Sequence, residues 1–201
     1  MGLPKLFMGL AAVGAGASII CNLAATMVTK PQAASLQYLA ESKLQSLDEQ
    51  KRNFSASELW SNRGAVIMAE AEGLSSLLPE MEARGVRLHA VVHEAFGADD
   101  FKPFIKGDVY LDLERRFYGP HERWMNIPGI FNYESLWQVF SIWQKGVPGN
   151  LKGEGRLLGA VFVVGPGDQG VLFQHNEMKI GDIANLDMVR EAIQRSNLPK
   201  S

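Results

Sequence analysis

The stretch 64–77 holds the residues best placed for chemistry. It begins with an apolar run that ends at Ala69 and passes into a helical pattern within a few residues. In an open α/β sheet, ligands and reacting groups lie at the carboxyl end of such a strand. The sequence there is Glu-Ala-Glu-Gly, with no thiol, hydroxyl nucleophile, histidine or phosphate-binding loop. Glu70 and Glu72 can serve as general acid or base, but two carboxylates in the first turn of a helix are explained more simply by the helix dipole.

The four histidines do not predict a metal site. His89 and His93 are four residues apart, which on a helix would favour a shared metal ion. They lie in an apolar, β-branched segment that reads as a strand, where the same spacing separates them by roughly 13 Å. His121 and His175 have no partner nearby in the sequence and are predicted to be surface or loop residues.

Two other features resemble functional motifs only superficially. The glycine-rich segment Gly149–Arg156 precedes a strand and lacks the Lys-Ser/Thr ending of a phosphate cradle, so a flexible loop is the better interpretation. Cys21 is the only cysteine, which excludes an intrachain disulfide and a cysteine-based zinc site. It lies in a hydrophobic segment, where a thiol is weakly ionised and a poor nucleophile. No metal ion or other cofactor is predicted.

Composition indicates a globular domain with accessory segments. The chain has 201 residues, of which 46% are hydrophobic and 21% charged, proportions ordinary for a protein with a real core. The net charge of −2 gives no basic footprint for nucleic acid.

Residues 1–30 are predicted to form a separate hydrophobic segment. Leu6–Val28 carries no charge and is bounded by Lys5 and Lys30, and it is long enough to span a bilayer as a helix. A signal-anchor helix, a cleaved signal peptide and a soluble hydrophobic helix are the three interpretations. The long apolar core and the thin positive region favour a membrane-associated anchor.

Residues 31–52 are predicted to form a linking helix. Leu36, Leu39 and Leu47 keep mostly to one face of a helix that would run from Gln32 to about Leu47. After it, Ser55 and Glu58 form a capping-box pattern that opens a short helix. The folded domain is therefore placed at residues 53–197.

The remaining pattern alternates strands with helices and predicts an α/β domain with a mixed sheet flanked by helices. The predicted strands are Ala65–Ala69, Val86–Val92, Val109–Leu111, a short Arg116–Tyr118, and the hairpin Ala160–Val164 with Val171–Gln174; the predicted helices are 74–83 closed by Gly85, one begun by Asp99 or Asp100, Tyr133–Trp143 capped by Asn132, and a last helix capped by Asn185.

Aromatic residues supply the candidate interaction surface. The four tryptophans, which are Trp60, Trp124, Trp137 and Trp143, are expected to be mostly core or interface residues. Trp137, Phe140 and Trp143 form an apolar stripe on the predicted helix 133–143. Together with Trp124 they predict a surface for a protein partner or a membrane.

Several longer motifs resemble a known family. They are Gly64–Ala69, Leu88–Glu94, Arg116–Pro120, Gly149–Gly155 and Leu158–Gly165. Together they resemble the peroxiredoxin-like 2 family, most closely its A-type branch. This resemblance implies a thioredoxin-like fold, an antioxidant and redox-regulatory function and a cytoplasmic location. The alternative location, secreted or membrane-anchored, follows from the hydrophobic N-terminus.

The resemblance fails where the family carries its redox motif, a Cys-x-x-Cys in the loop after the first of these segments. Ala69 runs directly into Glu70, and a block of residues with both cysteines is missing there. No catalytic residue can be carried over. Three hypotheses follow: a redox-regulatory family member with impaired thiol chemistry, a non-catalytic binding or regulatory module, and a prostaglandin-reducing enzyme like another branch of the family. The last also needs the missing thiols.

Overall fold

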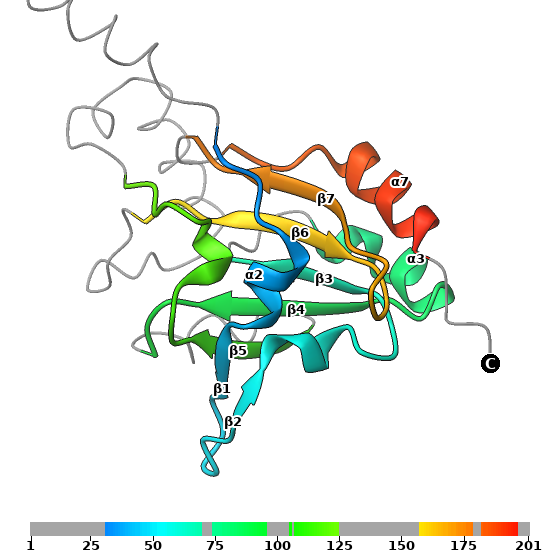
Figure 1. Ribbon diagram of the computed structural model, residues 1–201. Coiled ribbons are helices and arrows are strands. Elements are labelled where there is room, and N and C mark those ends of the chain that lie inside the picture. The colour runs from blue at the N-terminus through cyan, green and yellow to red at the C-terminus, as the bar shows by residue number, and fades with distance from the viewer. Residues whose placement is uncertain are drawn as a thin grey trace, which may run out of the picture. The chain divides into compact units, whose positions relative to one another are not determined.

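The computed structural model describes residues 31–69, 74–95, 105, 107–124, 157–178 and 182–196 (Figure 1). The chain divides into two units, Met1–Pro31 and Gln32–Ser201. All the elements below belong to the second unit.

A seven-stranded mixed sheet forms the centre of this unit, in the order β2-β1-β5-β4-β3-β6-β7. The three central strands β5, β4 and β3 are parallel, and the strands on either side of them run antiparallel to their neighbours. The strands are β1 (Lys43–Ser46), β2 (Asn53–Ser55), β3 (Ala65–Met68), β4 (Arg87–Val92), β5 (Asp108–Asp112), β6 (Ala160–Val164) and β7 (Val171–Asn176).

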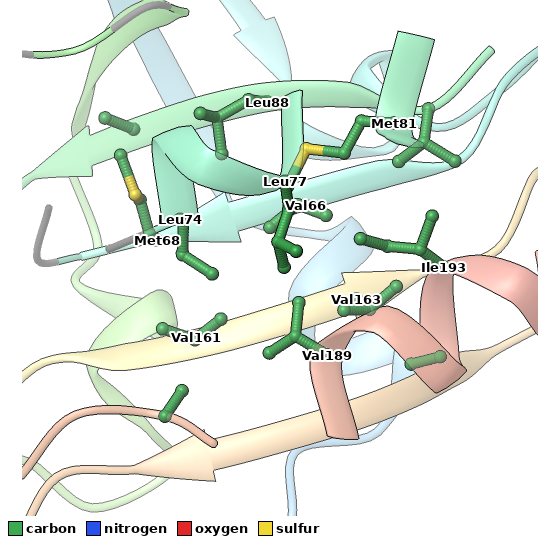
Figure 2. Packing of buried hydrophobic residues seen from close by; sticks show 14 of the residues in the cluster. Val66, Met68, Leu74, Leu77, Met81, Leu88, Val161, Val163, Val189 and Ile193 are labelled. Carbon is green, nitrogen blue, oxygen red and sulfur yellow. The ribbon is translucent and has the colours of Figure 1, made fainter. Parts of the chain in front are cut away.

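Strand β3 is buried on both faces, as its continuous apolar sequence predicts. Val66 and Met68 point toward one core, which Figure 2 shows packed against the helices on that face. Ala65 and Ile67 belong to a second core on the opposite face. The first face is covered by the 3-10 helix η2 (Leu74–Leu77) and the helices α3 (Leu78–Ala83) and α7 (Leu186–Arg195), and the second by α2 (Leu36–Ala40) and the 3-10 helices η1 (Ala56–Leu59) and η4 (Arg116–Tyr118).

Local sequence explains where the helices of the first face begin and end. Gly85 follows α3 with φ of +65°, a left-handed conformation that glycine adopts without strain. Asn185 caps α7, because its side chain accepts hydrogen bonds from the next helical N–H groups. Arg190 of α7 then donates to Glu80 of α3 at 2.9 Å, which ties the two helices together. The predicted cap is confirmed, and the predicted helix 74–83 is present as the 3-10 helix η2 followed by α3.

The predicted linking helix over residues 31–52 is wrong. The helix covers only Leu36–Ala40, and Lys43–Ser46 is strand β1, paired antiparallel with β5. Leu44 of this strand is fully buried. Pairing with a strand distant in sequence overrides the helical spacing of the leucines, so the sheet begins before residue 53.

Two smaller expectations are corrected as well. A short helix does follow Ser55, but it is a 3-10 helix without a side-chain cap. The Ser55 hydroxyl donates instead to the carbonyl of Ala40 at 2.6 Å, because that residue lies beside it across the fold. Arg116–Tyr118 forms the 3-10 helix η4 rather than a strand. The buried Asp112 carboxylate accepts from the Phe117 N–H at 2.9 Å and thereby folds the chain into a turn.

Several predictions lie outside the described residues: the hydrophobic segment 1–30, the helix begun near Asp99, the helix Tyr133–Trp143 and the loop Gly149–Arg156. Within the described ranges, no helix has the length and apolar character needed to cross a bilayer.

Candidate functional site at the carboxyl end of strand β3

The sequence places chemistry where β3 ends, and we call the connection from Ala69 to Leu74 the β3–η2 junction. The Ala69 N–H donates to the Ala160 carbonyl at 2.9 Å, so Ala69 extends the pairing of β3 with β6. The chain is next described at Leu74, which is 1% exposed and packs into the first core. Glu70 and Glu72 lie outside the described residues. Both flanks of the junction are thus firmly built into the fold.

Gly159, just before β6, forms one wall of the junction. A Cβ atom at this position would lie 3.2 Å from the Ala69 Cβ and 3.3 Å from its carbonyl carbon. These distances are shorter than most real contacts of a Cβ atom. A larger residue at this position would push Ala69 away by a few tenths of an ångström, so glycine suits this close approach of the two backbones.

Arg123 holds this wall in place. Its Nη2 donates to the Gly159 carbonyl at 2.8 Å and to the Leu158 carbonyl at 3.4 Å, and its Nε donates to the Glu177 carbonyl at 3.2 Å. Burial lowers the pKa of the Arg123 guanidinium, and the nearby Glu177 charge opposes that shift. A half-buried cation therefore lies next to the backbone that touches Ala69.

Glu177 completes the arrangement from the end of β7. Its carboxylate is buried and accepts from the Gly159 N–H at 3.1 Å, while its own N–H donates to the Gly159 carbonyl at 3.1 Å. We call Arg123, Glu177 and Gly159 the clamp. The clamp carries charge and fixed hydrogen bonds but no thiol, so it can position a reacting group and cannot replace the missing thiols.

His93 and Tyr118 lie near the same end of the sheet. The parallel register pairs Met68 with Ala90, which places the residues after β4 beside the junction. The Tyr118 hydroxyl donates to the Val91 carbonyl at 3.3 Å and lies 3.4 Å from the His93 Nδ1. The two rings meet edge to face, with centroids 5.3 Å apart.

His89 has a different environment from His93. It is 3% exposed, its Nδ1 lies 3.6 Å from an Asp108 carboxylate oxygen, and burial lowers its pKa to about 4. Neither histidine joins a metal-binding set, since the described part of the chain has no group of three His, Cys, Asp or Glu side chains suited to a metal ion.

The other sequence candidates lie away from the junction or outside the described residues. His121 is exposed, whereas His175 lies on strand β7, where its Nε2 is 2.8 Å from the Asp182 carbonyl oxygen. His175 therefore belongs to a strand and not to a loop, and its side chain is partly exposed, as the surface alternative predicts. Trp60 is buried in the core, whereas Trp124 is 42% exposed. Cys21, Trp137, Phe140 and Trp143 lie outside the described residues.

The sequence reasoning missed Arg123 and Glu177. The two residues are 54 positions apart and no local pattern links them. The one local signal that could have pointed here is the glycine at 159 next to an apolar strand, because such a glycine can mark a close backbone approach.

Comparisons with known proteins agree with this fold and place the chain in a family. The family described as "AhpC/TSA antioxidant enzyme" matches residues 73–179. Peroxiredoxin-like 2A of Homo sapiens is 42% identical, with 94% of this chain and 91% of that protein covered. Peroxiredoxin-like 2A of Rattus norvegicus is 40% identical, with 94% and 90% covered. Reduced Prx3 of Vibrio vulnificus, solved in complex with hydrogen peroxide, has a TM-score of 0.51 at 17% identity over 82% of this chain and 98% of that one.

These comparisons also bear on the missing block. The alignment with the rat protein spans 207 positions, more than the 201 residues of this chain. The relative therefore has residues inside the aligned region that this chain lacks. The likeness to the Vibrio protein shows a thioredoxin-like fold. With that fold and at this level of identity, the chain belongs to the peroxiredoxin-like 2 family, as an A-type member of the AhpC/TSA group that has a single cysteine.

Proposed function

We propose that this chain is a redox-regulatory member of its family in which reduction by a Cys-x-x-Cys centre has been lost. The observation that carries the proposal is the cysteine count. Cys21 is the only cysteine, and it precedes the strand that would carry the motif by more than forty residues. A dithiol centre needs one thiol to attack and a second to resolve the mixed disulfide.

The surroundings of the junction support this proposal. The strand before it, the helix after it and the clamp beside it are all formed, so the fold does not depend on the missing block. A shortened connection between a strand and a helix is within the range that α/β proteins use. These contacts support a proposed loss of chemistry and not of folding.

The assay measures turnover by the full chain. Purified protein is given hydrogen peroxide or insulin with dithiothreitol, beside its Cys21→Ala variant, a heat-denatured sample and a thioredoxin that has its Cys-x-x-Cys. We expect the native chain to match the background without protein. Turnover above background in the native chain, absent after heating, would contradict the proposal. The Cys21→Ala variant then shows whether the single thiol is responsible.

The location and partners of the chain belong to the same proposal. Cytoplasmic location follows from the family, and membrane association through Leu6–Val28 is the alternative that the sequence offers. Carbonate extraction of cell membranes separates the two, because a spanning helix stays in the membrane pellet and a soluble chain does not. A non-catalytic role through Trp137, Phe140 and Trp143 predicts that Trp137→Ala and Trp143→Ala abolish the capture of bound proteins.

A further inference from the structure

A pocket of about 540 Å³ lies at the end of the sheet opposite the β3–η2 junction. It is formed by α2, by the residues from η1 to Ser61, and by the turn between β6 and β7. The antiparallel register pairs Ala65 with Val164, which places this turn beside the start of β3. The Gly167 N–H donates to the Trp60 carbonyl at 2.8 Å and joins two of the pocket's walls. The pocket is therefore built from fixed elements and is separate from the clamp.

The pocket offers an apolar surface with polar groups around it. Leu36, Ala40 and Trp60 supply the apolar part. Trp60 is only 2% exposed, so its ring is held firmly by the second core. Pockets of about 300–1,000 Å³ with this mixture of groups are typical of sites for small molecules.

The charges at this pocket have one sign. Glu58 and Asp168 are the charged residues among those that line it, and both are carboxylates. Glu58 has one ion-pair partner among the described residues, Arg52, at 3.4 Å, and both side chains of that pair are more than half exposed. Asp168 has no partner within the described ranges. An exposed ion pair such as that of Glu58 with Arg52 contributes little to stability, so Glu58 can exchange Arg52 for another cation.

We propose that this pocket binds a small organic cation, a primary ammonium group on an apolar stem. The apolar stem would lie against Leu36 and Ala40, and the ammonium group would be held by the carboxylates of Glu58 and Asp168. The hydroxyl of Ser57, which also lines the pocket, can accept a further hydrogen bond from the ammonium. Free amines and the lysine side chain of a peptide share this chemistry. Amine binding at this pocket uses no thiol. A negative result for amine binding would therefore leave the proposed function untouched, and the reverse holds as well.

The test is an NMR titration of the full ¹⁵N-labelled chain with benzylamine. Benzyl alcohol, which has nearly the same shape without the charge, is the matched neutral probe. N-acetyl-lysine methylamide is the third probe and represents a peptide side chain. We expect benzylamine to shift the amide signals of Gly167 and Ser61 and to bind at least about threefold more tightly than benzyl alcohol, as one favourable charge pair allows.

Variants then locate the charge effect. Asp168→Asn and Glu58→Gln should each weaken benzylamine binding by about threefold or more, and benzyl alcohol should be unaffected. Glu49→Gln removes an exposed carboxylate from the turn between β1 and β2 and is the control for net charge. Equal binding of both benzyl probes, or equal weakening in the control variant, would overturn the proposal. If benzylamine binds and N-acetyl-lysine methylamide does not, the pocket is assigned to free amines. If both probes bind, the pocket also accepts lysine side chains.

Discussion

Replacing Arg123 by methionine removes the centre of the clamp. The arginine donates three hydrogen bonds to the carbonyls of Leu158, Gly159 and Glu177. Methionine fills much of the same volume and donates none of them. The Glu177 carboxylate, buried at 7% exposure, would also lose the cation that opposes its charge.

The expected cost follows from these contacts. A hydrogen bond to a charged group contributes about 1.5–3 kcal/mol, but a half-buried guanidinium still meets water, so the three bonds do not add in full. The Glu177 charge near the guanidinium adds a Coulomb attraction that solvent partly screens. We expect the free energy of unfolding of Arg123→Met to fall by about 3 kcal/mol, the value of one full-strength bond or two weakened ones. Arg123→Lys keeps the charge and should lose less.

Urea unfolding, followed by circular dichroism, measures this change as a lower midpoint at an unchanged slope. The matched control is Arg52→Met, which breaks the exposed pair with Glu58 and should cost less than about 1 kcal/mol. If Arg123→Met loses no more stability than Arg52→Met, the clamp does not hold the wall of the junction and the reasoning is refuted.

Three further substitutions test the burial and packing around the sheet by the same unfolding measurement. Burial lowers the His89 pKa to about 4. As pH falls from 6.5 to about 4, His89 therefore binds a proton in the unfolded chain but stays neutral in the folded chain. Stability should fall by about 3 kcal/mol over that window, and His89→Leu should remove this slope; an unchanged slope contradicts the assignment. Gly159→Ala should cost about 1–3 kcal/mol, because its Cβ presses on Ala69, and a neutral result would contradict the close approach. Ser42→Ala removes the hydroxyl that donates to the buried Asp112 carboxylate at 2.8 Å and should cost about 1–3 kcal/mol; no change would mean that another donor replaces it.

Local patterns were sufficient for the elements that bury their own side chains. Strand β3 and the hairpin of β6 and β7 follow from apolar runs and a glycine-rich turn. The cap at Asn185 follows from its side chain and the helical spacing after it. Each of these signals acts within a few residues, so one sequence contains all of it.

Elements that depend on distant partners were not predictable in this way. Lys43–Ser46 has leucines at helical spacing around it, yet it pairs with β5 because that strand offers an open edge and Leu44 a buried side chain. The predicted strand Val171–Gln174 ends one residue before His175, because polar residues from Gln174 onward end the apolar run, although β7 continues to Asn176.

The same difference between local patterns and distant contacts applies to the candidate site. Its position follows from the strand-to-helix pattern, and its lack of thiols follows from the cysteine count. The clamp does not follow from any local pattern, because the pairing of β6 with β7 is what brings Arg123 and Glu177 together. Charged residues in loops carry no local sign that they will be buried.

The central claim is that this copy of a redox scaffold lacks its thiol segment at the Ala69–Glu70 junction. Peptide mapping of the protein isolated from its natural cells tests that most directly. Trypsin cuts after Arg63 and Arg84, so the junction lies within the single peptide Gly64–Arg84. The account predicts this peptide at the mass of the printed sequence, without cysteine and unchanged by alkylation. A heavier peptide that takes up two alkyl groups between Ala69 and Glu70 would contradict it and restore a thiol centre.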